Sequence, residues 1–335
     1  MPVRVSINGF GRIGRLVLRA AFESGRDDIE IVAINDLAPP ATNAHLLKYD
    51  SVHGRFKGDV AVDGNDLIIN GKRVKGLQIS DPTQLGWGNL NVDVAMECSG
   101  RFTKRDDAAK HLQAGAKKVL ISAPATDEDL TVVYGVNHNE LKAAHTIVSN
   151  ASCTTNCLAP VAFVLDNAIG IERGFMTTIH SYTGDQRTVD TMHSDLHRAR
   201  AAALSMIPTS TGAAKAVGKV LPQLKGKLDG TSIRVPTPNV SVIDFKFDAK
   251  RATTVEEINQ AITAASNGAL KGILDAYSEP LVSTDFNHDA HSSIFALKET
   301  KVIDGTFVRV MSWYDNEWGF SNRMPDTAVA MMKAK

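Results

Sequence analysis

The chain has 335 residues, more than one hydrophobic core usually holds, and its 43% apolar and 22% charged content is typical of a globular protein. Its 37 Lys and Arg residues balance 37 Asp and Glu residues, so the formal net charge is zero and no overall field attracts nucleic acid or an acidic membrane. We therefore expect two domains with no nucleic-acid partner and no membrane partner, while local clusters of charge remain open as sites for a small anion.

The first predicted element is a strand over Val3–Ile7, where β-branched and polar residues alternate. Gly9–Gly14, with the sequence GFGRIG, follows at once and precedes a helical pattern over 15–24. A second strand pattern over Ile29–Ile34 is closed by polar residues that include Asp36. This succession of strand, glycines, helix and acid is the context that a dinucleotide-binding motif requires.

The residues of such a motif have separate physical roles. Gly9 permits the tight turn, Gly11 lets backbone N–H groups reach a pyrophosphate, and Gly14 lets the helix and strand pack closely. The helix N-terminus carries roughly half a positive charge toward the phosphates. Asp36 is expected to accept hydrogen bonds from an adenosine ribose and to repel a 2′-phosphate, which favours NAD over NADP. The alternative without a ligand is a plain βαβ turn with incidental glycines, which the full context disfavours.

The same alternation continues over the rest of residues 1–150. Strand patterns cover 92–98, 118–122 and 146–149, and a helix pattern covers 104–114. We predict a Rossmann-type doubly wound parallel sheet, in which ligands lie beyond the carboxyl ends of the strands. Polar residues at such ends are Ser99, Ser122 and Asn150. Cys98, which closes an apolar strand, is expected to be a small buried residue.

Two of the three cysteines lie close together in SNASCTTNCLAP, residues 149–160. Cys153 follows a strand and precedes a helix-like apolar pattern, so we expect it near a helix N-terminus, which favours thiolate over thiol. Pro160 leaves two alternatives open, a kinked helix or one that begins near the proline. Zinc would need a second Cys/His pair with suitable spacing, and we identify none, while strain and a reducing compartment oppose a disulfide. We predict a nucleophile at Cys153, a small buried residue at Cys157 and no metal site.

Three features predict a cytoplasmic protein. The odd, low cysteine count fits reduced thiols. The first ten residues, MPVRVSINGF, contain no basic segment followed by an apolar core, so we expect no signal peptide. No stretch approaches the ~20 apolar residues that are needed to cross a bilayer.

A candidate base follows the thiol. The strand pattern over Gly174–His180 places an imidazole at the end of a strand, on a rim and not in a core. The chain has ten histidines, and sequence distance says little about spatial distance, so spacing alone leaves His180 one candidate among several. Six others lie in polar loops or on helix faces, where we expect solvent exposure: His45, His53, His111, His138, His145 and His288.

The segment after His180 favours the binding of an anion. A turn over 181–186 is followed by several cationic side chains, among them Arg198. The loop over 208–215, PTSTGAAK, feeds a helix pattern and offers hydroxyls, N–H groups and a helix end to a phosphate. Arg234 lies within a strand pattern, where edge solvation and phosphate binding are both open. Together these features predict a substrate with an anionic group.

The remaining residues predict an α+β second domain. Strand patterns cover 231–247 and 291–313, and helix patterns cover 254–267 and 268–277. Because strands outnumber crossover helices, we expect a mainly antiparallel sheet with helices on one side. A last amphipathic helix is predicted over 322–333.

Seven segments resemble the phosphorylating glyceraldehyde-3-phosphate dehydrogenase family, in register over essentially the whole chain. They are INGFGRIGR, SNASCTTNCLAP, HSYTGDQ, RAR at 198–200, PTSTGAAKAVG, RVPTPNVSV and SWYDNEWG. The cysteine motif and RVPTPNVSV are far more specific than any glycine pattern. The resemblance implies NAD-dependent oxidation of glyceraldehyde 3-phosphate to 1,3-bisphosphoglycerate, in glycolysis or gluconeogenesis.

The resemblance also implies roles for individual residues. Cys153 would add to the aldehyde as a hemithioacetal, and His180 would take the proton as hydride leaves, giving a thioester that inorganic phosphate attacks. The substrate's own phosphate would contact Thr183 and Arg234, with Asp185 and Arg198 nearby. The attacking phosphate would contact Ser152, Thr154, Thr211 and Gly212. The dinucleotide would contact Asn8, Gly9, Gly11, Arg12, Ile13, Gly14, Asp36, Ser99, Ser122 and Asn316.

Domain organisation and assembly follow from the resemblance as well. The dinucleotide-binding domain would span residues 1–152 and be completed by a C-terminal helix over 317–335, with the catalytic domain over 153–316. Family members are homotetramers, in which an S-shaped loop around residues 182–204 lines a neighbour's cofactor site.

The chain departs from the family pattern at three places. Thr191-Met192 stands where NAD-specific members carry Leu-Pro, which leaves use of NADP open although Asp36 favours NAD. Phe320 replaces a frequent Tyr, and Ser80 stands where an Arg is common, which weakens one expected adenosine contact. Two rival functions are erythrose-4-phosphate dehydrogenase, which hydrolyses the thioester, and a non-enzymatic binding role. The hydroxyl loops at 152–154 and 209–212 favour attack by phosphate.

Overall fold

The structure of the protein is a computed structural model that describes residues 1–335. The chain divides into two compact units. The first unit joins Met1–Ala151 to Ser321–Lys335, and the second unit is Ser152–Phe320. Among the helices, none has the length and apolar character that a bilayer-spanning segment requires.

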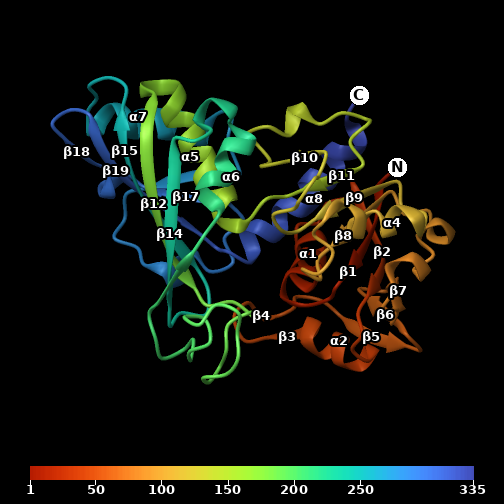
Figure 1. Ribbon diagram of the computed structural model, residues 1–335. Helices are drawn as coiled ribbons and strands as arrows, with labels where there is room; N and C mark the ends of the chain where they lie inside the picture. Colours follow the sequence, from red (N-terminus) through yellow and green to blue (C-terminus); the bar gives the residue numbers. More distant parts are fainter. The chain divides into compact units, whose positions relative to one another are not determined.

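The first unit is built on a nine-stranded sheet with the order β10-β11-β9-β8-β1-β2-β7-β6-β5. Neighbouring strands from β10 to β7 pair in parallel, and β6 and β5 extend the sheet in antiparallel fashion. The prediction of a Rossmann-type parallel sheet is therefore confirmed (Figure 1). The strands are β1 (Val3–Asn8), β2 (Ile29–Asn35), β5 (Val60–Asp63), β6 (Asp66–Ile69), β7 (Lys72–Leu77), β8 (Val94–Glu97), β9 (Lys118–Ile121), β10 (Leu130–Thr131) and β11 (Ile147–Ser149), with β3 (Tyr49–Asp50) and β4 (Gly54–Arg55) as a separate pair.

Helices of the first unit follow the strands closely. The longest of those that begin within Met1–Ala151 is α1 (Arg12–Glu23), which buries an apolar stripe that includes Leu16 and Ala20. The single helix predicted over 104–114 is wrong in detail, because the segment forms two short helices that meet at Ala109. The remaining segments are α2 (Pro40–Lys48), α3 (Arg105–Ala108), α4 (Lys110–Gln113) and the 3₁₀ turns η1 (Pro82–Gln84), η2 (Trp87–Leu90) and η3 (His138–Glu140).

The end of helix α8 (Trp318–Lys333) belongs to the first unit. The Lys118 Nζ, on β9, donates to the carbonyl oxygens of Met331 at 2.9 Å and Ala143 at 3.0 Å. Arg26 Nη1 donates to Asp326 Oδ1 at 2.8 Å. A lysine on the last carbonyls of a helix satisfies acceptors that the helix itself leaves unpaired.

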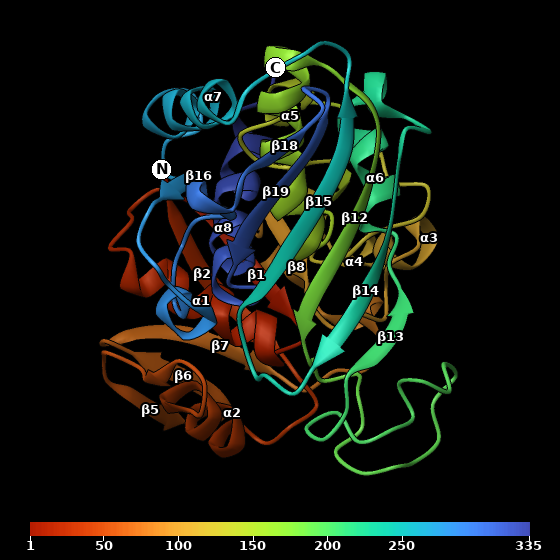
Figure 2. The same ribbon diagram turned by 90° about the vertical axis from the view of Figure 1, so that its left-hand side faces the viewer.

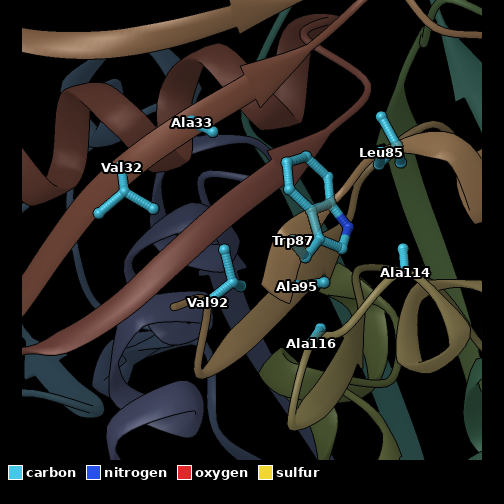
Figure 3. Packing of buried hydrophobic residues seen from close by; sticks show 8 residues of the cluster. All are labelled: Val32, Ala33, Leu85, Trp87, Val92, Ala95, Ala114 and Ala116. Carbon is cyan, nitrogen blue, oxygen red and sulfur yellow. The ribbon is translucent and has the colours of Figure 1, made fainter. Parts of the chain in front are cut away.

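A cluster of buried apolar residues packs around Trp87, as Figure 3 shows. Its members are Val32, Ala33, Leu85, Trp87, Val92, Ala95, Ala114 and Ala116. The small alanines make room for the indole, which is fully buried. The indole N–H donates to His111 Nδ1 at 3.1 Å, and His111 is itself 0% exposed. The expectation that His111 lies at the surface is therefore wrong, because the fold supplies its ring with buried partners.

The second unit contains a mixed sheet with the order β13-β14-β12-β15-β19-β17-β16, and β18 pairs with β19. Only the pairs β12–β14 and β16–β17 are parallel, so the prediction of a mainly antiparallel sheet is confirmed. The strands are β12 (Ile171–Ser181), β13 (Ile207–Ser210), β14 (Leu228–Val235), β15 (Ser241–Ala249), β16 (Leu274–Tyr277), β17 (Ser293–Ala296), β18 (Lys301–Ile303) and β19 (Phe307–Tyr314).

Helices cover one face of this sheet. In Figure 2 the strands β12, β14 and β15 lie in front of α5 and α6. The helix predicted over 268–277 is wrong, because Leu274–Tyr277 forms the edge strand β16 beside β17. Gly272, with φ of 78°, breaks the segment just before the strand. The helical segments are α5 (Cys153–Ile169), α6 (Ala213–Val220), α7 (Val255–Asn267), η4 (Pro222–Leu224), η5 (Ser283–Phe286) and η6 (Leu297–Glu299).

Candidate active site

The glycine-rich loop after β1 is packed too tightly for side chains at two of its three glycines. A Cβ on Gly9, which has φ of +90°, would lie 2.5 Å from the Ser99 nitrogen. A Cβ on Gly14 would lie 2.1 Å from the Gly9 oxygen. A Cβ on Gly11 would meet no atom within 4 Å, so this glycine faces open space. The loop thus brings α1 against β1 and leaves room for a ligand at Gly11.

Beside this loop lies a cavity of about 330 Å³. The N-terminus of α1 has no capping side chain, so its N–H groups are available to a phosphate. Asp36 is fixed by two backbone donors, since its carboxylate accepts from the Phe10 N–H at 2.8 Å and the Ala38 N–H at 2.9 Å. The cavity is lined by Asn8, Gly9, Gly11, Asn35, Asp36, Leu37, Ile79, Ser80, Cys98, Ser99, Arg101 and Phe102. A glycine cradle, an open helix end and an acid on one wall fit a dinucleotide.

Five expected dinucleotide contacts lie outside the lining of this cavity, namely Arg12, Ile13, Gly14, Ser122 and Asn316. Arg12 Nη1 donates to Asp50 Oδ2 at 2.7 Å, so the guanidinium is paired within the protein. Ile13 lies in the first turn of α1, next to Arg12. The Ser122 N–H donates to the Glu97 carbonyl oxygen at 3.0 Å, at the end of β9. Sequence reasoning missed Asp50, because the short strand β3 that carries it has no recognisable motif.

Cys153, in the second unit, stands at the start of a helix. Helix α5 begins at Cys153, and Pro160 lies inside it, which resolves the two alternatives that the sequence left open. The Ser152 Oγ caps the helix by accepting from the Thr155 N–H at 3.0 Å. Ala151, two residues before the cysteine, has φ of 57°, a conformation that costs energy for a residue other than glycine. The cap and the strained turn fix where the thiol emerges.

The thiol and an imidazole face each other. Cys153 Sγ lies 3.6 Å from His180 Nε2, and His180 is near the end of β12. The His180 Nδ1 lies 2.7 Å from the Ser181 carbonyl oxygen, which can only accept a hydrogen bond. Nδ1 therefore carries the proton, and the neutral ring directs the lone pair of Nε2 at the thiol. This is the arrangement that a general base needs.

Burial decides the resting protonation of the pair. Burial raises the pKa of the Cys153 thiol, against the opposing effects of Arg234 and Thr154. Burial, followed by the charge of Arg234, lowers the pKa of His180 to about 3. Both shifts favour a neutral thiol and a neutral imidazole, whereas the helix N-terminus favours a thiolate. The proton has to move to His180 as the sulfur attacks.

Four residues predicted to lie near the substrate's phosphate form one connected group. Arg234 Nη1 donates to Thr183 Oγ1 at 2.9 Å, and Arg198 Nη1 donates to Asp185 Oδ2 at 2.8 Å. The Thr183 hydroxyl donates to Asp185, which joins the two pairs. The Nε of Arg234 is buried and has no hydrogen-bond partner in the protein. A buried, unpaired N–H on a cation is a ready donor for an anionic group.

The second predicted phosphate site lies at two neighbouring helix N-termini. Gly212 is the N-cap of α6, and a Cβ on it would meet no atom within 4 Å. The Thr155 hydroxyl donates to the Ala213 carbonyl oxygen at 3.4 Å, which joins the first turns of α5 and α6. The Thr211 hydroxyl accepts from the Ala213 N–H at 3.2 Å. The two helix ends together create a positive environment for an anion.

Two further residues of this unit have their polar groups oriented by neighbours. Thr154 Oγ1 lies 2.8 Å from the buried Tyr314 hydroxyl, which sequence reasoning missed. The Asn316 Oδ1 accepts from the hydroxyls of Ser181 at 2.8 Å and Ser241 at 2.9 Å. Since two donors fix the oxygen, the NH₂ group of Asn316 is directed away from them. Tyr314 lies in the motif SWYDNEWG together with Asn316, and this motif is the feature of the sequence that could have indicated Tyr314 as a site residue.

The other cysteines have no such partners. Cys157 is fully buried beside Ser293, and burial raises its pKa to about 12. Burial also raises the pKa of Cys98 to about 12. All three cysteines are free thiols, and no group of three or more His, Cys, Asp or Glu side chains is arranged to hold a metal ion. Among the three, Cys153 is the one with a facing base.

A glycine cradle on a parallel sheet and a cysteine–histidine pair on a mixed sheet define a dehydrogenase that works through a thiol. A family model for the NAD binding domain of glyceraldehyde 3-phosphate dehydrogenase matches residues 3–105, and one for its C-terminal domain matches residues 152–316. The chain belongs to the glyceraldehyde 3-phosphate dehydrogenase family, which confirms the resemblance.

Relatives with that name cover almost the whole chain. The glyceraldehyde-3-phosphate dehydrogenase of Xanthobacter flavus is 68% identical over 333 residues, which is 99% of both chains. That of Geobacillus stearothermophilus is 59% identical over 330 residues, 98% of both chains. That of Pseudomonas aeruginosa is 57% identical over 336 residues, the full length of both chains. The similarity therefore includes both units.

Proposed function

We propose that this chain oxidises glyceraldehyde 3-phosphate with NAD and inorganic phosphate, with Cys153 as nucleophile and His180 as base. Membership of the family makes the chain an NAD-dependent oxidoreductase that acts on glyceraldehyde 3-phosphate. The observation that supports the two catalytic roles is the 3.6 Å separation of Cys153 Sγ and His180 Nε2, with Nδ1 held by the Ser181 carbonyl. The sequence prediction of a phosphorylating aldehyde dehydrogenase agrees with this proposal.

The reaction begins at the sulfur. As Cys153 Sγ bonds to the aldehyde carbon, the thiol proton passes to His180 Nε2 and is returned to the carbonyl oxygen, which leaves a hemithioacetal. NAD, when bound, supplies the acceptor for the hydride of that carbon. His180 Nε2 takes the proton of the hemithioacetal hydroxyl, and a thioester remains on Cys153. A phosphate oxygen then bonds to the thioester carbon, the C–S bond breaks, and the sulfur leaves with the electron pair and takes back the proton held by His180 Nε2.

The first unit provides the residues that would hold NAD. The cavity beside Gly11, the open N-terminus of α1 and the fixed carboxylate of Asp36 fit a dinucleotide without a 2′-phosphate. The proposed contacts of this unit are Asn8, Gly9, Gly11, Arg12, Ile13, Gly14, Asp36, Ser99 and Ser122. The pairing of Arg12 with Asp50 implies that Arg12 changes its partner if it contacts the pyrophosphate.

Two anion sites would serve the two phosphates. The buried, unpaired Nε of Arg234, together with Thr183, Asp185 and Arg198, supports a site for the phosphate of the substrate. The open space at Gly212 and the adjoining helix N-termini support a site for the attacking phosphate. Ser152, Thr154 and Thr211 would complete that second site.

Initial rates of NADH formation from glyceraldehyde 3-phosphate, with and without inorganic phosphate, test this proposal. We expect NADH formation to depend on added phosphate and NAD to be preferred over NADP. Erythrose 4-phosphate is the control substrate. NADH formation that is independent of phosphate, or faster with erythrose 4-phosphate, would contradict the proposal.

We also propose a cytoplasmic homotetramer with no nucleic-acid partner. Several large apolar side chains of the loop between β12 and β13 are strongly exposed, which supports an interface with another copy: Val189, Met192, Leu196, Leu204 and Met206. Three free thiols support a reducing compartment, and zero net charge opposes a general affinity for nucleic acid. Sedimentation of the purified chain measures the assembly directly, and a monomeric mass would contradict it.

A further inference from the structure

Beneath the dinucleotide loop lies a buried carboxylate that no assigned role explains. Glu97, the last residue of β8, is 1% exposed. Its Oε2 lies 2.6 Å from Asn8 Nδ2 and 3.0 Å from His111 Nε2. Its Oε1 accepts from the Ser99 N–H at 2.7 Å and from the Ser99 hydroxyl. Each carboxylate oxygen of Glu97 therefore has two hydrogen-bond partners.

The partners of Glu97 are all donors. The Trp87 N–H occupies His111 Nδ1, so the neutral ring carries its proton on Nε2 and donates to the carboxylate. Trp87 is held by the apolar cluster of Figure 3 and cannot turn away. Only an acceptor with four open lone-pair positions can serve Asn8, His111 and both groups of Ser99, and a carboxylate is that acceptor.

The network continues across the ends of three neighbouring strands. Asn8 ends β1, and its Oδ1 accepts from Asn35 Nδ2 at 2.7 Å at the end of β2. The Asn35 Nδ2 donates to the Ile79 carbonyl oxygen at 2.8 Å, and the Asn35 Oδ1 accepts from the Ile79 N–H at 2.9 Å. Ser99, Asn8, Asn35 and Ile79 line the cavity, whereas Glu97 does not. The carboxylate therefore lies behind the cavity wall and is hydrogen-bonded to two residues that line it, Asn8 and Ser99.

We propose that Glu97 is the positioning residue of the NAD site, which sets NAD affinity without touching NAD. It fixes Ser99 against Gly9, where a Cβ on the glycine would lie 2.5 Å from the Ser99 nitrogen, and it fixes the amide of Asn8. Hydrogen-bonded groups that are already in place lose little entropy when a ligand arrives. The inference rests on the proposed use of NAD.

Glu97→Gln tests it, because the amide keeps the shape but replaces one acceptor oxygen by a donor. We expect the Kd of NAD, measured by calorimetry at 25 °C on the full chain, to rise at least tenfold. Asp93→Asn is the matched control, since Asp93 joins the same two strands at their opposite ends through the Arg4 N–H at 2.9 Å. We expect this control to lower the melting temperature and leave the Kd within threefold.

A double-mutant cycle separates positioning from general stability. Asn8→Asp alone places two carboxylates face to face and should also weaken NAD binding at least tenfold. In the double variant Asn8→Asp/Glu97→Gln the donor and acceptor are exchanged, so NAD should bind more tightly than in either single variant. A double variant whose losses simply add, or a Glu97→Gln chain that binds NAD like the wild type, would overturn the inference.

Variants of His111, a hydrogen-bond partner of Glu97, provide a second test. If Glu97→Gln does not fold, His111→Leu removes one donor and should raise the Kd of NAD at least threefold, whereas His111→Gln, which retains a donor and an acceptor, should not. Equal Kd values for these two variants would overturn the inference. A wild-type chain that binds no NAD contradicts the proposed function, while a wild-type chain that binds NAD and a Glu97→Gln chain that binds equally well contradict only the role of Glu97.

Discussion

His180 and Arg234 are register partners on the adjacent parallel strands β12 and β14. A single register therefore brings the proposed base and the proposed phosphate ligand to one edge of the sheet. Burial, followed by the charge of Arg234, lowers the pKa of His180, and the same charge opposes the rise that burial causes in the pKa of Cys153. A phosphate bound at Arg234 would offset this charge, so His180 becomes a stronger base when the substrate is in place.

Replacement of the nucleophile should separate chemistry from binding. We expect Cys153→Ala to lower kcat by ~10⁴-fold or more, because no other group can carry the thioester. The Kd of NAD should stay within a few-fold. Cys157→Ala is the control: it removes a buried thiol one helical turn away and should cost ~1 kcal/mol of stability with kcat retained. Substantial turnover by the Cys153→Ala chain would contradict the assignment of Cys153 as the nucleophile.

Loss of the base should have a smaller effect than loss of the nucleophile. We expect His180→Asn to lower kcat by ~10²–10⁴-fold, the usual contribution of a positioned general base. The hydrogen-bonding amide keeps the side chain polar, so the fold should persist. Single-turnover measurements with glyceraldehyde 3-phosphate report the step directly, and an unchanged rate of NADH formation would exclude His180 as the base.

His180 also predicts how stability depends on pH. Its pKa is about 3 in the folded chain, against an ordinary value of 6.5. Between these values the unfolded chain binds more protons, so the contribution of His180 is fully present above pH 6.5 and is lost as the pH falls toward 3. Urea unfolding at pH 6.5 and pH 4 should show that the wild type loses up to ~3 kcal/mol more than His180→Asn. His45→Asn, at an exposed histidine, should follow the wild type.

Arg234 should govern the reactivity of the thiol as well as substrate affinity. Arg234→Met removes the charge that opposes the rise in the pKa of Cys153 caused by burial, so alkylation by iodoacetamide at pH 8 should slow. The KM for glyceraldehyde 3-phosphate should rise at least tenfold. Arg173→Met, at an exposed arginine paired with Asp248, is the control and should alter neither quantity. Faster alkylation in Arg234→Met would contradict the electrostatic coupling.

Two glycines of the dinucleotide loop should respond differently to the same substitution. Gly14→Ala places a Cβ 2.1 Å from the Gly9 oxygen, so it should lower both the melting temperature and NAD affinity. Gly11→Ala meets no protein atom within 4 Å, so the fold should be unaffected and only NAD binding should weaken. Thermal unfolding and calorimetry measure the two quantities separately. Normal NAD binding in Gly11→Ala would mean that no ligand lies close to this glycine.

The parts of the fold that follow from local pattern were predictable. Alternating strand and helix patterns predicted the parallel sheet, and the apolar pattern after Cys153 predicted a helix N-terminus near this residue, while a start near Pro160 was left open. The segment 268–277 was misread, because a short apolar run fits a helix or a strand equally well and only pairing with β17 decides. His111 was misplaced at the surface, since its polar neighbours in sequence conceal the buried partners Trp87 and Glu97.

The geometry of the site depended on contacts that spacing cannot reveal. The strand pattern made His180 a candidate base among ten histidines, but its distance from Cys153 could not be read from the sequence, and the family resemblance supplied the pairing. The register that aligns it with Arg234 joins residues 54 positions apart in the chain, and the approach of Tyr314 to Thr154 joins residues 160 apart. Asp50 and Glu97 carry no motif, so their hydrogen bonds had to be observed. Side chains that support the site from behind are therefore the part that sequence reasoning misses.

The return of helix α8 to the first unit has a consequence for synthesis. Residues 321–335 are synthesised after the whole of the second unit, yet Lys118 donates to the Met331 carbonyl oxygen and Arg26 donates to Asp326 in the first unit. The second unit is continuous in the sequence, whereas the first unit is complete only when residues 321–335 have followed the whole of the second unit. Until α8 is made, the Lys118 ammonium lacks the Met331 carbonyl oxygen, so the first unit is the later of the two to be completed.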